Sequence, residues 1–577
     1  MSNQHDSRSA RGRTATRLVS LAAAFVLVAC GGGGGGSSPT PPPPPAPPPP
    51  PAGGAALTGT LRGPISAQVV LQNNGGDNLT STVALSAGNT DRYDETPFSF
   101  TTLLAAGTAY QVNLFTTPAN QTCSVYKGAT GTTPVAATAL RVGCEHTYDR
   151  ISRSSNNAVL GTYYDSRDPV VGGSNEAIGA TTAGYGEGRF VAFVSNSAGM
   201  ANGSTNARRQ VFWRDNLTGE TVLVSANAAG EEGNDDSWAP SISADGLVVA
   251  FESYASNLVA GDTNGVRDVF VRSATSTAGV QRVSVGTGGL EANAASYQAT
   301  VSGDGRVVAF VSGASNLTAG VSGTSTINVI RRDLTTGTNT LISANASGNG
   351  VGGGHPALSE DGNRLAFYSY ALTLAGDTNG LWDIFVYDHA AGSTTRVSLT
   401  STGGERNQGT ESASRVVAPA ISGNGRYVAY STTASNVVPG DTNGMQDVFI
   451  VDTQTGDVAR VSVSSAGAQG NADSPVGQGE RVGLSYDATW VTFSTASNNL
   501  GAGAGATGIS NAMLRNNVTG ETRAITNSTN GSVGPIALSR QGGYAVFGTS
   551  NSLDVRYSGS GLFSHFTGAT RSWWWVD

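Results

Sequence analysis

The feature of this sequence that most constrains its fold is a phrase that returns throughout residues 148–577, a short turn followed by an apolar strand. The clearest copies are SADGLVVAFES, SGDGRVVAFVS, SEDGNRLAFYS and SGNGRYVAYST, and three further copies are degenerate. The aromatic residue of each copy falls, in chain order, at Phe193, Phe251, Phe310, Phe367, Tyr430, Phe493 and Phe547. The period of 54–63 residues indicates one structural unit repeated seven times.

Each unit has room for four strands. A short apolar stretch such as APSIS precedes the turn, a VVAF-type strand follows it, and DVFV-type and RVSV-type stretches come next. Asp-Gly and Thr-Gly turns between alternating apolar runs are hairpin signals, because glycine accepts a positive φ. The sequence therefore predicts an all-β chain, with a seven-bladed β-propeller of four-stranded blades over residues 148–577.

Closure of the propeller ring is open to two interpretations. The stretch DRISRSS at 149–155 looks like a detached last strand, and TRSWWWVD at 570–577 does as well. Because both cannot hold the same edge position, the first stretch either adds a fifth strand that closes the ring or serves only as a linker. We favour closure, since an unpaired strand edge is a liability.

The chain begins with a predicted export signal at 1–29. Four arginines precede the apolar run LVSLAAAFVLVAC, which is too short for an ordinary membrane-spanning helix. Its end, LVAC, resembles the lipobox of bacterial lipoproteins, which implies acylation of Cys30 and anchoring in a membrane. In terms of that family, Gly31 favours the outer membrane, with the protein either periplasmic or surface-exposed. The alternative is an ordinary secretory signal with an unrelated cysteine.

A tether and a small domain follow. The glycines and prolines of 30–52 predict a flexible start and a stiff polyproline rod. Short alternating segments over 53–147 predict a β-sandwich. In an exported chain, Cys123 and Cys144 predict a disulfide, with a metal site or catalytic thiol as the alternative. The stretches VVLQNNGGDNLT, QTCSVYKGATG and ALRVGC resemble a small immunoglobulin-like module of bacterial surface lipoproteins, whose two cysteines match this pair.

The S-x-D-G-x-x-x-A-F phrase of the repeats resembles the WD-like repeat of TolB-type propellers. The resemblance implies a role in protein–protein contact in the cell envelope. This chain departs from the pattern in its predicted lipid anchor and its extra N-terminal domain, so the family's particular partners are not carried over. The net charge of −8 and the single lysine, Lys127, leave no basic stripe for phosphates, and nucleic-acid binding is not expected.

The motif D-x-N-G-x-x-D occurs in three units, within SNLVAGDTNGVRDVFV and its counterparts. Its residues are Asp262, Asn264 and Asp268; Asp377, Asn379 and Asp383; and Asp441, Asn443 and Asp447. Carboxylate and amide oxygens at alternate positions suit calcium, although the bidentate glutamate of an EF-hand is missing. The alternative needs no metal, because Asp and Asn cap their own turn and accept N–H groups where the next strand begins. We favour the capped turn, with calcium as the one candidate cofactor.

These loops and the long loops between units are expected on one face of the propeller, and binding sites favour loops on a rigid scaffold. Candidate residues of this face are Glu231, Glu232, Asp235, Asp236, Trp238 and His355. The acidic four form either a solvated loop or a cation site, and His355 lies just before a first strand, near the expected channel mouth. The tryptophans at 573–575 either pack against a neighbouring blade or form a sugar-stacking platform.

No catalytic constellation accompanies these residues. Beyond the predicted signal the sequence has four scattered histidines and no G-x-S-x-G elbow. The leading hypothesis is a non-catalytic envelope lipoprotein that presents its propeller to a protein or peptide. The alternatives are a surface glycan-binding or glycan-cleaving propeller, assisted by calcium, and a structural spacer. Exposed aromatic residues on the loop face favour a glycan, whereas burial of Trp238, Tyr297 and Trp382 between blades disfavours it.

Overall fold

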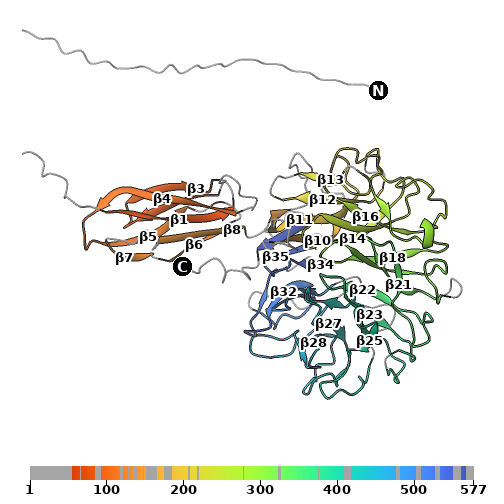
Figure 1. Ribbon diagram of the computed structural model, residues 1–577. Helices are drawn as coiled ribbons and strands as arrows, with labels where there is room; N and C mark the ends of the chain where they lie inside the picture. Colours follow the sequence, from red (N-terminus) through yellow and green to blue (C-terminus); the bar gives the residue numbers. More distant parts are fainter. Residues whose placement is uncertain are drawn as a thin grey trace, which may run out of the picture. The chain divides into compact units, whose positions relative to one another are not determined.

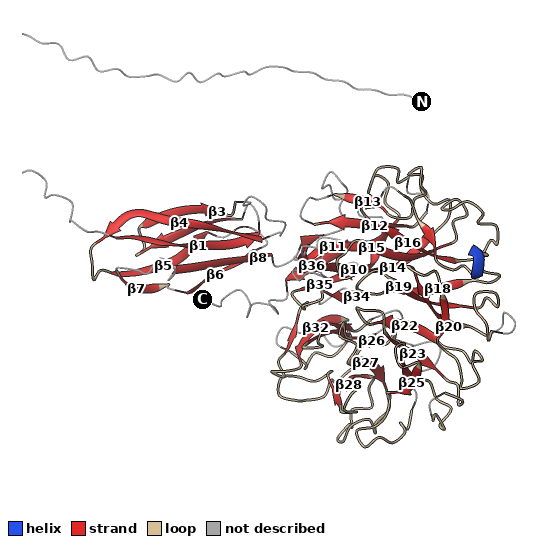
Figure 2. Cartoon of the chain, viewed as in Figure 1, coloured by secondary structure: helices blue, strands red, loops and turns tan. Residues whose placement is uncertain are grey.

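The computed structural model of this chain is built almost entirely from β-strands (Figure 1, Figure 2). It describes residues 55–566, with gaps at 65–66, 85–92, 117, 119–120, 128, 134–139, 147–148, 151–165, 175–184, 206–207, 217–219, 277, 322–325, 375, 409–416, 476–480, 502–507, 527–532 and 550–560. The predicted signal, Cys30 and the tether therefore lie outside the described residues. Within those residues the helical content is one short 3-10 turn, η1 (Thr287–Gly289), and no helix there is long and apolar enough to cross a membrane.

The N-terminal domain is a sandwich of two four-stranded sheets. In strand order the sheets are β4 (Tyr93–Leu104), β1 (Ala55–Pro64), β8 (Leu140–His146) and β6 (Gln121–Lys127), and β3 (Asp77–Thr82), β2 (Gln68–Asn73), β5 (Ala109–Thr116) and β7 (Thr130–Thr132). Leu61 and Phe100 of the first sheet share one core with Leu71 of the second. The predicted disulfide joins Cys123 and Cys144 across the neighbouring strands β6 and β8.

Seven further four-stranded sheets follow, here numbered blades 1 to 7 in chain order. Blades 1 to 3 are β10 (Ser166–Ser174), β11 (Tyr185–Ser195), β12 (Gln210–Asp215) and β13 (Thr221–Leu223); β14 (Ser237–Ile242), β15 (Val248–Ser253), β16 (Asp268–Ser273) and β17 (Gln281–Arg282); and β18 (Ser296–Val301), β19 (Val307–Ser312), β20 (Asn328–Asp333) and β21 (Asn339–Leu341). Blades 4 to 6 are β22 (Gly354–Leu358), β23 (Arg364–Ser369), β24 (Asp383–Asp388) and β25 (Ser393–Arg396); β26 (Ala420–Ile421), β27 (Tyr427–Thr432), β28 (Asp447–Asp452) and β29 (Val458–Arg460); and β30 (Gly483–Leu484), β31 (Trp490–Thr495), β32 (Asn511–Asn516) and β33 (Thr522–Ala524). Blade 7 is β34 (Val533–Leu538), β35 (Tyr544–Thr549), β36 (Gly561–Phe566) and β9 (Asp149–Arg150). The blades follow one another around a common centre, which is the architecture of a β-propeller (Figure 1).

The repeated Ser-x-Asp-Gly turn joins the first two strands of a blade and is held by its own side chains. In blade 2, Asp245 accepts a hydrogen bond from Ser243 Oγ (2.5 Å) and another from the main-chain N–H of Leu247 (2.9 Å). Gly246 follows with a φ of 77°, where a side chain is strained. A Cβ there would also lie 2.3 Å from Phe190 of the preceding blade. The turn therefore requires glycine for its backbone and for blade packing.

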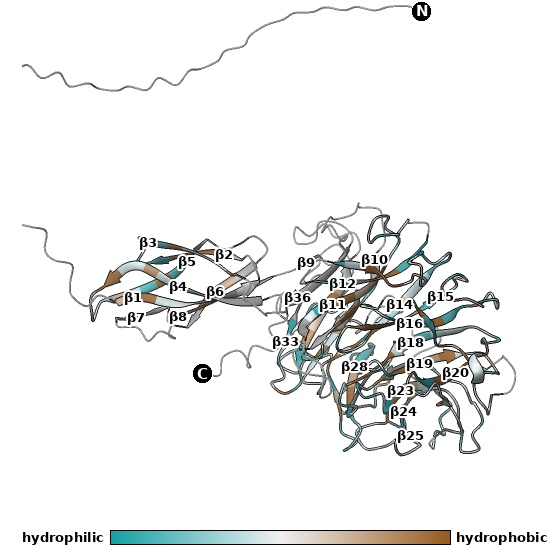
Figure 3. Cartoon of the chain, turned by 45° about the horizontal axis from the view of Figure 1, so that its top comes forward, coloured by the Kyte–Doolittle hydropathy of each residue, from teal (hydrophilic) through white to brown (hydrophobic). Residues whose placement is uncertain are grey.

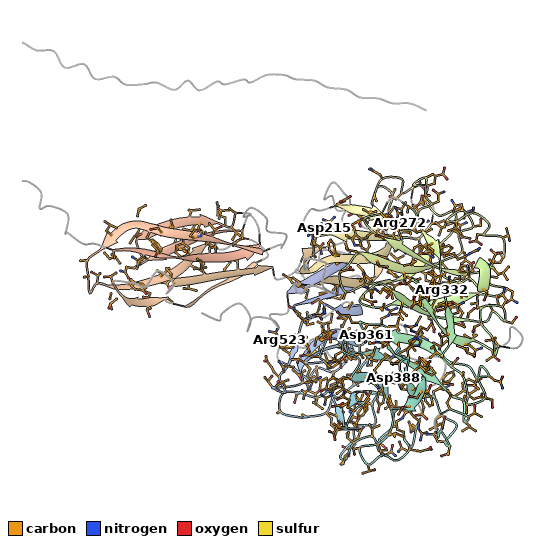
Figure 4. The ribbon with its side chains drawn as sticks, viewed as in Figure 1. Asp215, Arg272, Arg332, Asp361, Asp388 and Arg523 are labelled. Atoms are coloured by element: carbon orange, nitrogen blue, oxygen red, sulfur yellow. A yellow bond between two sulfur atoms is a disulfide. The ribbon has the colours of Figure 1, made fainter. Side chains whose placement is uncertain are left out.

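Aromatic pairs form the cores of the blades. In blades 1, 2 and 5 the repeated Phe or Tyr of the second strand stacks on an aromatic residue of the third strand, as in Phe251 and Phe270, whose ring centroids are 5.7 Å apart. In blades 3 and 6 the residue opposite is Ile330 or Met513. The strands of the blades carry many hydrophobic residues, coloured brown in Figure 3, and a large part of them is buried. Arginines of the third strands tie one blade to the preceding one. Arg272 donates to Leu223 O (2.9 Å), and Arg332, also labelled in Figure 4, donates to Val285 O (3.2 Å).

The ring is closed by a strand from the N-terminal side of the propeller. Strand β9 pairs antiparallel with β36, so that Asp149 lies opposite Ser564 and Arg150 opposite Phe563. It is the fourth strand of blade 7, not the fifth strand that we expected, because the C-terminal segment supplies only three strands of this blade among the described residues. The stretch 570–577 lies outside those residues.

The antiparallel order gives the propeller two different faces. The loops between second and third strands, and those leading to the next blade, emerge on one face, here called the loop face. The remaining turns form the turn face, where side chains of different blades meet at the centre. Glu360 of blade 4 and Arg540 of blade 7 form an ion pair of 2.7 Å there, and the Arg540 guanidinium lies 4.1 Å from the Tyr486 ring centroid. Since blades 4 and 7 stand three positions apart in a ring of seven, this pair spans the propeller axis.

Candidate functional site

A central channel of about 390 Å³ runs between the seven innermost strands. Small side chains such as Val170, Ala357 and Ala537 line it. The Glu360–Arg540 pair lies across the axis on the turn face, and the loop-face end of the channel is here called its mouth. A concave site with few polar groups at its rim is the usual form of a ligand site.

The polar rim of the mouth is made by backbone bulges. Ala239, Gln298 and His355 hold the same position in three successive innermost strands, each with a φ of 49–53°. The ladder to the second strand shifts its register beside each of them. Such a φ is uncommon for residues other than glycine, and it persists only where the surroundings hold it. All three residues line the channel, and Arg481 joins them from blade 6.

Glu252 of β15 holds the bulge of the following blade. Its side chain is buried, one oxygen accepts the main-chain N–H of Gln298 (2.5 Å), and the other pairs with Arg267 (3.0 Å). Burial raises the pKa of the Glu252 carboxyl, and the charge of Arg267 opposes that rise. Both carboxyl oxygens are thus engaged by the protein itself.

His355, predicted near the mouth, lies in it and is neutral. Burial, helped by the charge of Arg481, lowers the pKa of its imidazole to about 4. Gln298 Nε2 lies 2.6 Å from His355 Nε2, and because an amide nitrogen can only donate, the imidazole nitrogen accepts. The ring also stacks on Tyr368, with centroids 5.0 Å apart. These contacts fix the ring and leave it uncharged at neutral pH.

A second hollow, here called the aromatic pocket, opens beside the mouth between blades 3 and 4. It has a volume of about 330 Å³. Its aromatic wall consists of Tyr297, Tyr368, Tyr370 and Trp382, with His355 and the backbone of 352–354 completing it. Trp382 meets Tyr370 edge-on, with centroids 4.8 Å apart, and Tyr370 is 55% exposed. Full burial between blades was expected to disfavour a glycan ligand for three residues. All three are half-buried: Trp238, Tyr297 and Trp382.

The three D-x-N-G-x-x-D loops have the geometry of capped turns. In blade 2, Asn264 Oδ1 accepts the N–H of Val266 (3.0 Å), and its amide donates to Asp268 Oδ2 (3.0 Å). Asp268 also accepts from Ser284 Oγ, which in turn accepts the N–H of Val269. Asn379 and Asp383, and Asn443 and Asp447, have the corresponding turn and serine bonds.

A guanidinium lies between the two carboxylates of each loop. In blade 2, Arg282 is 3.5 Å from Asp262 and 3.7 Å from Asp268, and a third carboxylate, Glu291, lies 2.6 Å from it. The equivalent arginine distances in blades 4 and 5 are 3.3 Å to Asp377 and 3.5 Å to Asp383, and 3.0 Å to Asp441 and 3.2 Å to Asp447. Asp262, Asp268 and Glu291 are close enough together to hold a metal ion. Calcium there stays a prediction, and it requires the arginine to move.

The carboxylates around Arg282 have unequal proton affinities. Burial raises the pKa of Asp262 to about 6, and the charge of Asp268 adds to that rise. Burial also acts on Glu291, but hydrogen bonds from Thr263 and Arg282 outweigh it and hold the pKa of Glu291 at about 2. Glu291 is therefore the carboxylate that stays ionised beside the guanidinium, and Asp262 takes up a proton at a higher pH than Glu291 does.

These arginines were missed in the sequence, although a signal for them exists. Arg282, Arg396 and Arg460 stand opposite the repeated aromatic of the third strand in the three blades that carry the motif. Blades 1 and 3, which lack the motif, have Leu223 and Leu341 at that position. Comparison of the repeats with one another thus links the arginine to the acidic loop.

The predicted acidic group of the loop face is divided among separate partners. Glu231 accepts from Asn227 (2.8 Å), Glu232 from the N–H of Thr205 (2.9 Å), and Asp236 from the N–H of Arg209 (2.8 Å), while Asp235 pairs with Arg208 (3.4 Å). Trp238 packs against Tyr254, with ring centroids 5.4 Å apart. The tryptophans at 573–575 lie outside the described residues.

The sequence matches no protein-family model and no curated protein. Similar solved structures include TolB from Acinetobacter baumannii, at 15% identity and a TM-score of 0.31, over 55% of this chain and 61% of that one. They also include a putative TolB from Agrobacterium tumefaciens (15%, 0.32, over 57% and 90%) and an oligogalacturonate lyase from Vibrio parahaemolyticus (11%, 0.38, over 65% and 86%). The chain thus spans less than two thirds of the first of these. At such low scores, the propeller assignment stands on the strand topology of this chain.

Proposed function

We propose that this protein is a non-catalytic binding module of the cell envelope, which takes a protein or peptide segment at the loop-face mouth of its propeller. The observation that carries the proposal is the central channel, which is lined by the innermost strands and has the Glu360–Arg540 ion pair across the axis on the turn face. A rigid scaffold that gathers its irregular loops around one opening is suited to binding.

The chemistry of the mouth supports binding over catalysis. A general base needs a free lone pair within reach of the substrate. The oxygens of Glu252 are taken up by Gln298 and Arg267, and the imidazole of His355 accepts from the Gln298 amide. The groups that are left at the rim, such as the exposed Arg481, suit recognition of a carbonyl or carboxylate.

The envelope location rests on the sequence of residues 1–52. The arginines, the apolar run and LVAC favour a lipid on Cys30, and the tether gives the folded part reach from the membrane. Metabolic labelling with an alkyne fatty acid tests this point. We expect label in the native chain and none in Cys30→Ser, and an unlabelled native chain contradicts the anchor.

The binding proposal is tested by placing a photocrosslinking amino acid in the full chain, in cells. At position 481 the crosslinker lines the channel, whereas at position 518 it lies on a third-to-fourth-strand turn of the turn face and is also exposed. We expect one envelope polypeptide to be crosslinked at 481 and not at 518, with the contact mapped to a defined segment by mass spectrometry.

A channel-filling variant sharpens the test. Ala357 lines the channel, so Ala357→Phe narrows it without touching the rim. The crosslink at 481 is expected to disappear in this background while the thermal unfolding curve keeps its shape. A crosslink that persists, or that forms equally at 518, contradicts binding at the mouth, and a polysaccharide adduct alone would replace the peptide with a glycan.

A further inference from the structure

Between blades 2 and 3, the position equivalent to the aromatic pocket is filled by a side chain of the protein itself. Between blades 2 and 3, the guanidinium of Arg267 lies 4.3 Å from the Tyr297 ring centroid, and 5.6 Å and 6.0 Å from those of Trp238 and Tyr254. Glu252 pairs with this guanidinium at 3.0 Å. The aromatic group between blades 2 and 3 is thus occupied by a cation of the chain, with a buried carboxylate to balance it.

Between blades 3 and 4, one step around the ring, the equivalent positions carry different residues. The register of the innermost hairpins aligns Trp238, opposite Glu252, with Tyr297, opposite Val311, and it aligns Tyr297 with Gly354 of the next blade. Likewise, the residue before the third strand changes from Arg267 to Ile327. The carboxylate and the cation are therefore replaced by a valine and an isoleucine, and the ring that the following blade supplied is replaced by a glycine. The missing side chain at 354 leaves the pocket open, since a Cβ there would meet within 4 Å only Gln298 Oε1, at 3.4 Å.

The lining of the pocket indicates what class of ligand it takes. It contains aromatic rings, neutral polar groups and glycine backbone, and no Asp, Glu, Lys or Arg. Tyr368 is 2% exposed, and its hydroxyl has no hydrogen-bond partner among the described residues. Burial raises the pKa of this phenol, so it remains a neutral donor. A buried polar group of this kind is expected to have a partner, which a ligand or a water supplies.

From these observations we propose that the aromatic pocket between blades 3 and 4 binds a neutral pyranose sugar ring. A pyranose has an apolar C–H face that packs on the negative face of an aromatic ring, here Tyr370 or Tyr297. Its hydroxyl groups can pair with Tyr368 Oη and with the glycine backbone. The volume of about 330 Å³ lies at the lower end of the roughly 300–1,000 Å³ of small-molecule sites, which fits one ring.

The internal comparison disfavours the other occupants of an aromatic pocket. Between blades 2 and 3 a carboxylate accompanies the cation among the aromatic rings. The aromatic pocket lacks that carboxylate, so a cationic ligand is disfavoured there. An anionic ligand meets no cation in the lining. An aromatic side chain of a peptide fills the space but leaves fewer groups for Tyr368 Oη, so it is kept as an outcome of the test.

Saturation-transfer NMR on the purified full chain tests the proposal. The neutral probes are glucose, galactose, mannose and N-acetylglucosamine. Glucosamine, glucuronate, tetramethylammonium and N-acetyltryptophanamide represent the charged and peptide-like classes. We expect transfer to at least one neutral sugar and weaker or no transfer to the charged probes.

Three variants assign the signal to the pocket. Gly354→Tyr introduces a bulky aromatic at the position that Tyr297 holds in blade 3, and is expected to abolish sugar binding. Tyr370→Ala removes one wall and should weaken binding about tenfold. Tyr254→Ala is the matched control, because Tyr254 holds the position of Tyr370 in blade 2, is 45% exposed and does not line the pocket. It should bind as the native chain does.

Several outcomes overturn the inference. They are the absence of transfer to every neutral sugar, sugar binding that Gly354→Tyr leaves intact, and a charged or peptide-like probe that binds in place of the sugars and is lost in Gly354→Tyr. Circular dichroism and thermal unfolding of each variant separate lost binding from lost fold. The sugar site does not depend on the proposed protein partner, since the crosslink at 481 and the sugar signal are measured independently.

Discussion

Glu360 and Arg540, 180 residues apart in the sequence, meet at 2.7 Å across the axis of the propeller. Their side chains are only 15% and 13% exposed, respectively. Gly303 and Gly423 make room for this contact, because a Cβ at either position would come within 3.2 Å of the Glu360 side chain. The pair therefore joins opposite blades through the one point where the turns converge.

Arg540→Met is expected to destabilise the propeller by about 3 kcal/mol, since it leaves a largely buried carboxylate unpaired. The double variant Glu360→Met/Arg540→Met should lose less, because no lone charge remains. Urea unfolding followed by tryptophan fluorescence measures this in the propeller alone, since the sandwich contains no tryptophan. Arg306→Met, at a 74% exposed arginine, is the control and should change stability by less than about 0.5 kcal/mol. Equal losses for the single and double variants would contradict a buried pair.

Arg282→Leu should create a calcium dependence that the native chain lacks. The variant has the leucine that blades 1 and 3 carry at this position. It leaves Asp262, Asp268 and Glu291 without the guanidinium that lies between them. Like charges then repel, and a divalent oxygen-seeking ion relieves the repulsion. We expect the unfolding temperature of the variant to fall and to recover in part with calcium, with no calcium effect on the native chain. A calcium-dependent rise in the native chain would instead support the calcium prediction.

Asp262→Asn tests the unequal proton affinities. The folded pKa of Asp262, about 6, lies above its ordinary 3.8, so the folded state binds the proton more tightly between these values. The contribution of Asp262 to stability therefore falls as the pH rises through that window. The unfolding temperature of Asp262→Asn relative to the native chain should be higher at pH 7.5 than at pH 4.5.

Glu291→Gln is the control of opposite sign. The folded pKa of Glu291, about 2, lies below its ordinary 4.5, so its contribution is present above pH 4.5 and is lost as the pH falls toward 2. The deficit of Glu291→Gln should therefore be larger at pH 7.5 than at pH 3.5. If the differences of both variants from the native chain are constant with pH, the electrostatic account of this cluster fails.

Gly246→Ala should destabilise the propeller more than Gly265→Ala. Both glycines have a positive φ, which strains an alanine by about 1 kcal/mol. Only Gly246 also faces a neighbour, Phe190, whereas a Cβ at Gly265 meets nothing within 4 Å. The additional overpacking is expected to cost about 1–3 kcal/mol. Urea unfolding of both variants gives the comparison, and equal losses would show that the close approach to Phe190 is relieved cheaply.

What the sequence predicted was local in the chain. The Ser-x-Asp-Gly turn, the strands beside it and the turn capped by Asn264 depend on residues a few positions apart, and all are present. Asp268, which we expected to accept N–H groups of the next strand, instead accepts from the side chains of Asn264 and Ser284, and Ser284 takes the N–H of Val269. Because the unit repeats, the strands and turns predicted for one unit were predicted for the other units as well. The disulfide of Cys123 and Cys144 followed from the only two cysteines beyond Cys30.

What the sequence did not predict depends on contacts between distant segments. The role of β9 as a fourth strand rests on pairing with residues more than 400 positions away. The aromatic pocket is lined by Gly354 of one blade and Tyr297 of the preceding blade, and no local sequence pattern brings these two residues together. The guanidinium between Asp262 and Asp268 could have been predicted from the sequence, because the repeat position of Arg282 holds an arginine in the three units that carry the motif.

The pairing of β9 with β36 also decides how the propeller would respond to tension. Only two residues separate His146, the end of the sandwich, from Asp149, the start of β9. A pull on anything N-terminal to the propeller therefore reaches this seam first, where the described part of the chain pairs Asp149 with Ser564 and Arg150 with Phe563. This seam is where mechanical load from the N-terminal side would open the ring.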